Sequence, residues 1–190
     1  MGDFTVIKLV NARLRQLLFD GMTGEAGQYF NELDDIYVGS PRETAELQTK
    51  SLSVFLYQIT EDPYLKNRPP VRGNGASRLS MPPMALRFHY MITPFLADPD
   101  ANALVLGKVL ETLYDAPSLT LTDPMTGQTE EVRVVLETPS LSDLAEVWEA
   151  LREPYRLSLA YQLRVPRLES TRQLAATPVG DSSHGFGGTP

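Results

Sequence analysis

The feature that most constrains the fold is a ten-residue stretch, 84–93, in which apolar and polar side chains alternate. Its apolar face consists of Met84, Leu86, Phe88, Tyr90 and Ile92, and its polar face contains Arg87, His89 and Thr93. A period of two predicts a strand with one buried face. Residues 157–165 repeat the alternation and predict a second long strand. Residues 52–59 are apolar on both faces at their centre, which is typical of a central strand covered on both sides.

Three segments show the helical spacing of apolar residues. They are bounded by Asp3 and Gly21, by Asp100 and Pro117, and by Ser140 and Pro154. The third opens with the capping-box pattern of Ser140 and Asp143. The expected buried stripes are Ile7, Val10, Leu14, Leu17 and Leu18; then Leu106, Val109, Leu110, Leu113 and Tyr114; and finally Leu141, Leu144, Val147, Trp148 and Leu151. These spacings predict three amphipathic helices.

Shorter strands are expected between these elements. Residues 119–122 and 132–136 flank a turn that contains Asp123, Pro124 and Gly127, which is the arrangement of a longer-looped hairpin. The segment 22–46 has a weak pattern, and we expect a loop there with one edge strand at 36–38.

A stretch rich in proline and glycine, 62–83, interrupts the regular patterns. We expect it to be too broken for helix or sheet. It is also longer than the structureless loops that a compact domain normally contains, and long loops of this kind are usually functional.

The order of the expected elements does not show the strict strand–helix alternation of a doubly wound fold. The sequence therefore predicts an α+β fold, with a mixed β-sheet and about three flanking helices. The length of 190 residues suits one domain, which we place at 1–168. Residues 169–190 are small, polar and rich in glycine, and they predict a flexible C-terminal tail.

The composition excludes several classes of chemistry. The sequence has no cysteine, which excludes disulfides, thiolate zinc sites and iron–sulfur clusters. It has only two histidines. Its 17 basic and 24 acidic side chains give a net charge of -7, which opposes non-specific binding to nucleic acid or anionic lipid. We therefore expect no cofactor, no metal and no nucleic-acid partner.

The first twenty residues are not typical of a targeting signal. Lys8, Arg13 and Arg15 interrupt the apolar residues there, and no small-residue cleavage site follows. No apolar run in the sequence approaches the roughly 18 residues that a membrane span needs. We therefore expect a protein that folds in the cytoplasm and does not insert into a membrane.

The sequence contains no recognisable catalytic motif. The glycines near Gly21 and Gly73 lack the residues that complete a phosphate loop or a dinucleotide fingerprint. His89 lies on the polar face of a strand, outside any H-E-x-x-H or G-x-S-x-G context, so a structural or solvent-facing role is favoured. We expect no enzymatic activity, and an enzyme that uses His89 with nearby carboxylates remains an alternative.

Charge is distributed unevenly along the chain. Residues 63–97 have five basic and no acidic side chains, whereas residues 98–151 have two basic and eleven acidic ones. If these blocks lie on different sides of the fold, copies of the chain can dock head to tail. We expect Arg68, Arg72 and Arg78 to be interface residues. Two alternatives are ion pairs within one chain and binding of nucleic acid, and the lack of interleaved aromatic residues disfavours the second.

Several segments together match the pattern of one known family. They are LSVFLYQI at 52–59, DPYLKNRP at 62–69, PPMALRFHYMIT at 82–93, LVLG at 104–107, and the stretch 144–161 with Trp148, Tyr155 and Arg156. In this order, over roughly residues 4–168, the chain resembles the N-terminal domain of tube-terminator, or cap, proteins of contractile injection systems of the virulence-cassette and antifeeding-prophage type. Departures from the family pattern are Asp62 for asparagine, Lys66 for arginine, and Phe88 and Met91 for leucine.

The resemblance implies a non-enzymatic structural protein with a fold similar to that of phage tail terminators. It implies a homohexameric ring that ends the inner tube and contacts the last sheath ring, so that the partners are other copies of the chain, the tube protein and the sheath protein. Such a role needs shape, interface area and charge pattern rather than a catalytic group. The alternative is a small soluble adaptor or peptide-binding module without catalytic activity.

Overall fold

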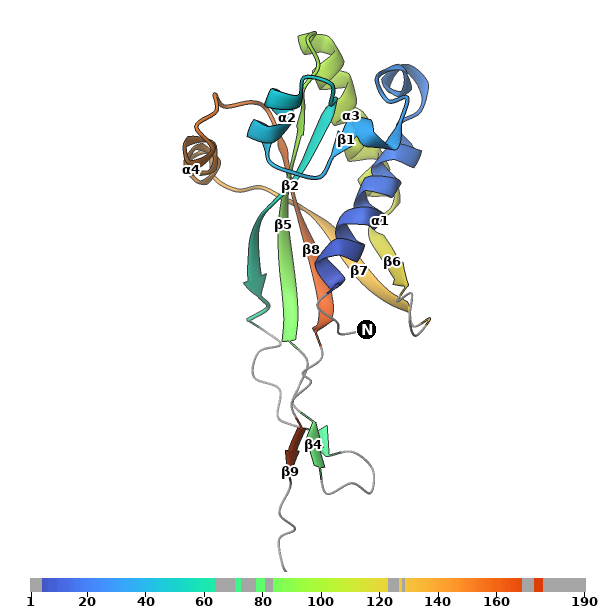
Figure 1. Ribbon diagram of the computed structural model, residues 1–190, viewed down its shortest axis with the longest axis vertical. Helices are drawn as coiled ribbons and strands as arrows, with labels where there is room; N and C mark the ends of the chain where they lie inside the picture. The colour runs from blue at the N-terminus through green and yellow to red at the C-terminus, as the bar shows by residue number, and fades with distance from the viewer. Residues whose placement is uncertain are drawn as a thin grey trace, which may run out of the picture.

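The computed structural model describes residues 5–63, 71–72, 78–80, 84–122, 127, 129–168 and 173–175. Its main body is a curled sheet of six strands in the order β1-β2-β5-β8-β7-β6 (Figure 1). The strands are β1 (Ile36–Tyr37), β2 (Leu52–Glu61), β5 (Met84–Pro94), β6 (Ser118–Thr122), β7 (Thr129–Glu137) and β8 (Leu159–Leu168). In this sheet β1 runs parallel to β2, and the other neighbouring strands are antiparallel.

Helices flank this sheet, so the α+β prediction is confirmed. They are α1 (Val6–Gly21), α2 (Pro41–Leu47), α3 (Pro99–Asp115) and α4 (Leu141–Leu151), with two 3₁₀ turns at Gly24–Tyr29 and Leu33–Asp35. The hairpin expected around residues 119–136 is present as β6 and β7.

The hydrophobic core lies between the sheet and two helices, α1 and α3. We call this side of the sheet the inner face. Its strands contribute Phe88, Tyr90, Ile92, Val132, Val134, Tyr161, Leu163 and Val165, and the helices contribute Val6, Val10, Leu14, Leu18, Val105, Val109 and Leu113. Burying one such aliphatic or aromatic side chain stabilises the fold by about 1.5–3 kcal/mol, so this layer dominates the stability.

The buried stripes of α1 and α3 are rotated slightly from those expected. In α1 the buried line includes Val6, whereas Ile7 is 37 % exposed. In α3 the buried line runs through Ala101 and Val105, whereas Leu110 and Tyr114 are exposed. Both helices bury a row with a spacing of four, because that row forms the ridge that packs against the sheet and the neighbouring helix.

β2 was expected at the centre of the sheet, and this prediction was wrong. The central strands are β5 and β8. The edge strand β1 pairs with β2 only at Leu52 and Ser53. Burial of β2 therefore falls after Val54, and its second half is half-buried or exposed. A run of β-branched and aromatic residues indicates a strand but does not give its position in a sheet.

α1 and α3 approach each other closely at Gly21. A Cβ atom at this position would overlap the side chain of Thr112 and would lie 2.9 Å from its Cβ. Glycine is needed here because the two helices are in contact, in addition to its role in ending α1.

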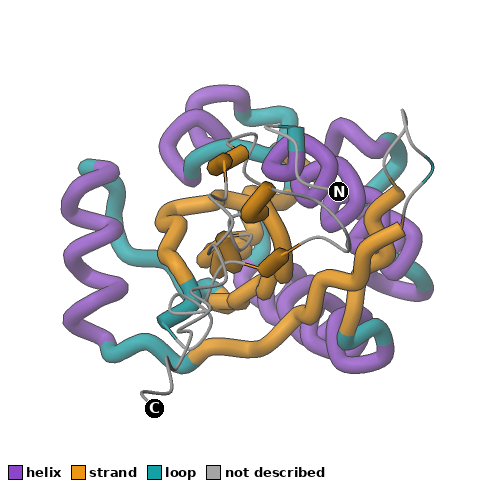
Figure 2. The backbone as a smooth tube through the Cα atoms, turned by 90° about the horizontal axis from the view of Figure 1, so that it is seen from below, coloured by secondary structure: helices purple, strands orange, loops and turns teal. Residues whose placement is uncertain are grey.

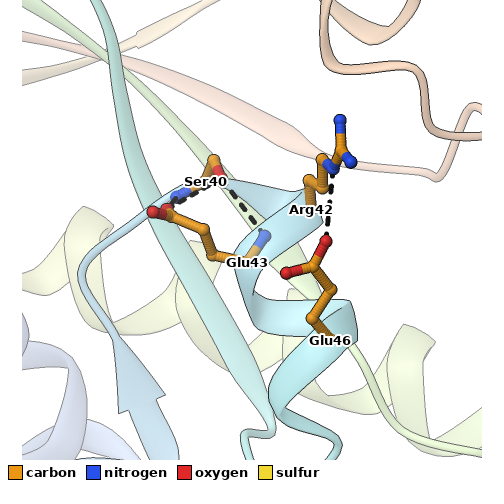
Figure 3. Close-up of polar contacts among 4 residues, drawn as sticks. All are labelled: Ser40, Arg42, Glu43 and Glu46. Atoms are coloured by element: carbon orange, nitrogen blue, oxygen red, sulfur yellow. Dashed lines mark hydrogen bonds and ion pairs between the residues drawn. The ribbon is translucent and has the colours of Figure 1, made fainter.

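The sequence patterns missed α2, which lies in the segment expected to be a loop. Ser40 caps this helix by accepting a hydrogen bond from the Glu43 backbone N–H, and Pro41 occupies the first helical position. Figure 3 shows the cap together with the ion pair between Arg42 and Glu46. The capping box and the proline were readable in the sequence, but the helix has only seven residues and lacks a long apolar stripe.

The stretch 62–83 and the predicted tail both contribute to a second, smaller sheet. Its strands are β3 (Val71–Arg72), β4 (Arg78–Ser80) and β9 (Gln173–Ala175), in the order β3-β4-β9 (Figure 1). The expectation that 62–83 contains no sheet was therefore wrong, because β4 gains partners on both sides. The domain boundary at residue 168 coincides with the end of β8 and remains a prediction.

Candidate functional site

The outer face of the sheet, opposite α1 and α3, carries a chain of hydrogen bonds. His89 Nε2 lies 2.9 Å from Thr60 Oγ1, and His89 Nδ1 lies 2.9 Å from Glu137 Oε2. Gln162 Nε2 donates to Glu137 Oε1 at 2.7 Å, and Arg164 Nε donates to Gln162 Oε1 at 3.0 Å. These five residues, which we call the polar network, connect β2, β5, β7 and β8. They help to fix the register of these four strands.

The polar network contains a hydroxyl, an imidazole and a carboxylate in the order that serine hydrolases use. In this chain both ring nitrogens of His89 and both carboxylate oxygens of Glu137 have partners within the sheet. The His89 side chain is only 12 % exposed, so a solvent-facing His89 is wrong. A satisfied network of this kind rigidifies a sheet, and the geometry agrees with the structural role expected for His89.

A second polar contact lies nearby on the outer face. Arg87 donates from Nε to Asp62 Oδ2 at 3.1 Å, and its Nη2 lies 3.1 Å from Asp62 Oδ1. Asp62 is 8 % exposed, so this two-pronged ion pair is largely shielded from water. The charge of Asp62 holds Arg87 in this chain.

Three arginines lie directly opposite one another across three adjacent strands. Arg164 on β8 pairs in register with Arg87 on β5 and with Arg133 on β7. We call these residues the arginine row. Arg133 and Arg164 are exposed, and neither has an ion-pair partner among the described residues. Like charges directly opposite each other destabilise a sheet, so an additional counter-charge would stabilise this surface.

α4 stands apart from the rest of the molecule. Figures 1 and 2 both show it at the margin, joined to the sheet by a loop at each end. The expected capping box of Ser140 and Asp143 is present. The expected buried stripe is only partly covered: Trp148 is buried, Leu144, Val147 and Leu151 are half-buried, and Leu141 is 69 % exposed. Trp148 packs edge-on against Tyr155, with 6.1 Å between ring centroids.

An open groove of about 650 Å³ separates α4 from the outer face of the sheet. The sheet side contributes Tyr57, Gln58, His89 and Glu137, and the helix side contributes Asp143, Glu146, Val147 and Ala150. Burial raises the pKa of the Tyr57 hydroxyl, and the charges of Glu137 and Asp143 raise it further. The groove is therefore a negatively charged site that suits cationic or hydrogen-bond-donating groups.

A second groove, of about 660 Å³, is mainly apolar and lies where the end of α3 crosses β7 and β8. It is lined by Leu110, Leu113, Tyr114, Pro117, Leu136 and Tyr161, among others. Tyr114 is 85 % exposed and Leu136 is 49 % exposed, so the chain leaves a substantial apolar surface in contact with water here.

Comparison with known protein families gives a match over almost the whole chain. The family model of the Pvc16 N-terminal domain matches residues 9–181. The chain belongs to this family. No curated protein matches it by sequence.

Two solved structures are similar to this Pvc16 N-terminal domain. One is the cryo-EM structure of the PVC sheath/tube terminator of an extracellular contractile injection system in the extended state, with a TM-score of 0.66 and 26% identity. The other is the tube-terminating cap of the anti-feeding prophage, with a TM-score of 0.59 and 27% identity. The similarity covers 100% and 90% of this chain, and 66% and 57% of the respective structures. This chain thus spans about two thirds or less of the length of these two relatives.

Two of the three arginines expected at an interface lie in the small sheet of this Pvc16 N-terminal domain. Arg72 is in β3, where its backbone pairs with Leu79, and Arg78 is in β4, where its backbone pairs with Ala175. Arg68 lies outside the described residues. The role of these three arginines remains a prediction.

Sequence reasoning missed Arg133 and Arg164 as candidates. Each lies at a polar position of an alternating strand, which is unremarkable when one strand is considered alone. They become a feature only when β7 and β8 pair in the observed register, and a single sequence carries no direct signal of that register.

Two kinds of feature are absent from the residues that the structure describes. In these ranges, no three histidine or acidic side chains are grouped closely enough to hold a metal ion. None of the helices that the structure describes has both the length and the apolar character needed to cross a membrane.

Proposed function

We propose that this chain is a structural cap, or tail terminator, which ends the inner tube of a phage-tail-like contractile injection system and contacts the last sheath ring. The observation that carries this proposal is the family match over residues 9–181, because the two similar structures are a sheath/tube terminator and a tube-terminating cap. The fold suits the role, since it offers two grooves, a charged surface and the helix α4, which stands apart from the sheet, for contacts with other proteins.

The proposal is tested with particles from a strain that lacks the chain. A terminator limits the growth of a filament, so we expect electron micrographs of the deletion strain to show tubes and sheaths of abnormal length or with unfinished ends. Reintroducing the chain should restore the parental length distribution. Particle lengths and ends that are indistinguishable from those of the parent would contradict the proposal.

The proposed assembly is a ring, with six copies as the expected number, in contact with the tube protein and the sheath protein. Ring formation suits a chain whose 63–97 block is wholly basic and whose 98–151 block is strongly acidic, because complementary surfaces allow head-to-tail docking. Arg68, Arg72 and Arg78 are proposed to contribute to these contacts. Assembly in the cytoplasm is part of the proposal, and the cysteine-free sequence is compatible with a reducing compartment.

The proposed role involves no catalysis. The nitrogens of His89 are engaged by Thr60 and Glu137 inside the sheet, which favours a structural role for the imidazole. We expect the variant His89→Gln to retain normal particle length and function in a preparation whose folding is confirmed by circular dichroism. A well-folded variant that has lost all biological output would instead support chemistry at this residue.

A peptide-binding adaptor is the second candidate function, and the apolar groove between α3 and β7 favours it. Measurement of molecular mass separates the two candidates. A cap should form rings alone or when tube protein is added, whereas an adaptor should stay monomeric in both conditions. The variant Leu110→Asp should abolish peptide capture by an adaptor through this groove.

A further inference from the structure

α4 is an amphipathic helix whose own chain covers it only in part, since Leu144, Val147 and Leu151 are half-buried. Helices of eleven residues are marginally stable in water unless packing supports them, yet only Trp148 is buried. Leu141 is 69 % exposed, and Leu157, in the loop that follows the helix, is 65 % exposed. The arm, defined here as residues 138–158 with α4 at its centre, therefore has the surface of an element that binds another molecule.

The polar side of α4 is acidic. Asp143, Glu146 and Glu149 follow one another at intervals of three residues and are exposed. Asp143 accepts hydrogen bonds at the helix cap, whereas Glu146 and Glu149 have no ion-pair partner among the described residues. The arm also contains the exposed Arg152 and Arg156, but its acidic side chains are in excess, and on α4 itself the exposed carboxylates have no cationic side chain among them.

A complementary surface exists on the same chain. Arg133 and Arg164 face outward from β7 and β8, directly opposite each other and without ion-pair partners in the described part of the chain. Val135 follows on the same face of β7 and is 37 % exposed. This surface offers two positive charges beside an apolar side chain, which matches the composition of the arm.

Within one chain, the arm does not supply counter-charges to Arg133 and Arg164. The groove under α4 is lined on the sheet side by Tyr57, Gln58, His89 and Glu137, and neither Arg133 nor Arg164 is among its lining residues. Glu131 lies two residues before Arg133 on the same face of β7, but it forms no ion pair with Arg133 among the described residues. Glu137, further along β7, already accepts hydrogen bonds from His89 and Gln162. No carboxylate in the described part of the chain therefore forms an ion pair with Arg133 or Arg164, which leaves both charges open to a partner.

We infer that the acidic arm of one copy docks on the Arg133–Arg164 surface of a second copy. Glu146 and Glu149 supply the missing counter-charges, and exposed apolar side chains of the arm cover Val135. The contact joins two different surfaces, so it is heterologous and repeats from copy to copy, which produces a closed ring when the rotation permits. This inference rests on the proposed function, since it names the contact that would hold the ring together.

Charge reversal tests the contact. The variant Arg133→Glu/Arg164→Glu and the variant Glu146→Arg/Glu149→Arg should each lose assembly, with a fall of about tenfold or more in the assembled fraction at fixed concentration. Native mass spectrometry, with and without tube protein, measures this fraction. The control Lys8→Glu/Arg13→Glu makes the same charge change as the first variant, at two exposed positions on α1, and should assemble normally.

Mixing the two reversed variants gives the sharpest outcome. In the mixture, the acidic arm of the first variant can bind the unmodified Arg133–Arg164 surface of the second. The basic arm of the second can bind the acidic surface of the first, so the mixture should form rings in which the variants alternate. Rings that form equally well from each variant alone would overturn the inference and leave the cap function intact. If each variant forms rings but loses tube or sheath binding, the arm serves those proteins, and the inference is also overturned.

Failure of the proposed function has a different signature. In that case the unmodified chain would neither assemble, alone or with tube protein, nor restore particle length in the deletion strain. A parent chain that caps tubes as a monomer would overturn the docking inference alone.

Discussion

The two faces of the six-stranded sheet show the same alternation of side chains but differ in what covers them. The inner face packs against α1 and α3 and forms the core. The outer face carries the polar network and the arginine row, and α4 stands across an open groove from it. Stability is thus concentrated on one face, while the other presents polar and charged groups to its surroundings. The buried residues of the inner face hold the fold, and the exposed residues of the outer face remain accessible to other molecules.

The largest expected effect comes from the inner face. Phe88→Ala removes a fully buried side chain from β5 and should lower the free energy of unfolding by about 3–5 kcal/mol. Val135→Ala, on the outer face of β7, should cost less than about 1 kcal/mol. Urea denaturation of the two variants measures the difference. Equal losses would show that the two faces contribute alike.

The ion pair between Asp62 and Arg87 is the outer-face contact with the largest expected contribution. Arg87→Ala should destabilise the fold by about 2 kcal/mol, because it removes a two-pronged partner from a carboxylate that is 8 % exposed. A double-mutant cycle with Asp62→Ala should give a coupling energy of about 1–2 kcal/mol. A coupling near zero would mean that the pair contributes nothing to stability.

The close contact of α1 and α3 behind the inner face should be sensitive to one added methyl group. Gly21→Ala should cost about 1–3 kcal/mol, because the new Cβ overlaps the side chain of Thr112. Adding Thr112→Ala should recover part of this loss, since it removes two of the three overlapping atoms. Thermal unfolding of both variants checks the expectation, and no recovery would place the strain elsewhere.

A smaller, pH-dependent effect is expected at α2, the short helix beside β2. Hydrogen bonds from the Ser40 backbone and side chain lower the pKa of Glu43 below its usual value of 4.5. A lowered pKa contributes stability above the unfolded-state pKa, and this contribution is lost as the pH falls through the folded-state value. Glu43→Gln should therefore cost about 0.5 kcal/mol at pH 7 and progressively less below about pH 4.5. A difference in the free energy of unfolding between the parent chain and the variant that does not change with pH would contradict this expectation.

The smallest effect on stability is expected in the arm. Leu141→Ser should change the free energy of unfolding by less than about 0.5 kcal/mol, because the side chain is 69 % exposed. The same substitution should weaken ring formation, which native mass spectrometry measures. A variant that unfolds readily would show that α4 is part of the core of its own chain.

Much of the fold was predictable because its elements carry local signals. β5, β8, α1 and α3 follow clear periods, and the capping box of Ser140 and Asp143 marks the start of α4. The short helix α2 was missed because seven residues give too little periodicity. β2 was misplaced because an apolar run does not reveal how many neighbours a strand has.

The candidate site was predictable only in part. His89 was recognised as a polar residue on a strand, but its partners Thr60 and Glu137 lie 29 and 48 positions away in the sequence. The arginine row depends on the register of three strands. For α4 the apolar stripe was visible, but its periodicity cannot show whether the same chain or another chain covers it.

The two loops that hold α4 have a mechanical consequence. Residues 138–140 and 152–158 are irregular, so a displacement of α4 would require rotations in these tethers and loss of the Trp148 packing, but it would break no hydrogen bond between strands. A particle that contracts imposes displacements on its end pieces. A helix suspended in this way can follow such a displacement without unfolding the body to which it is attached.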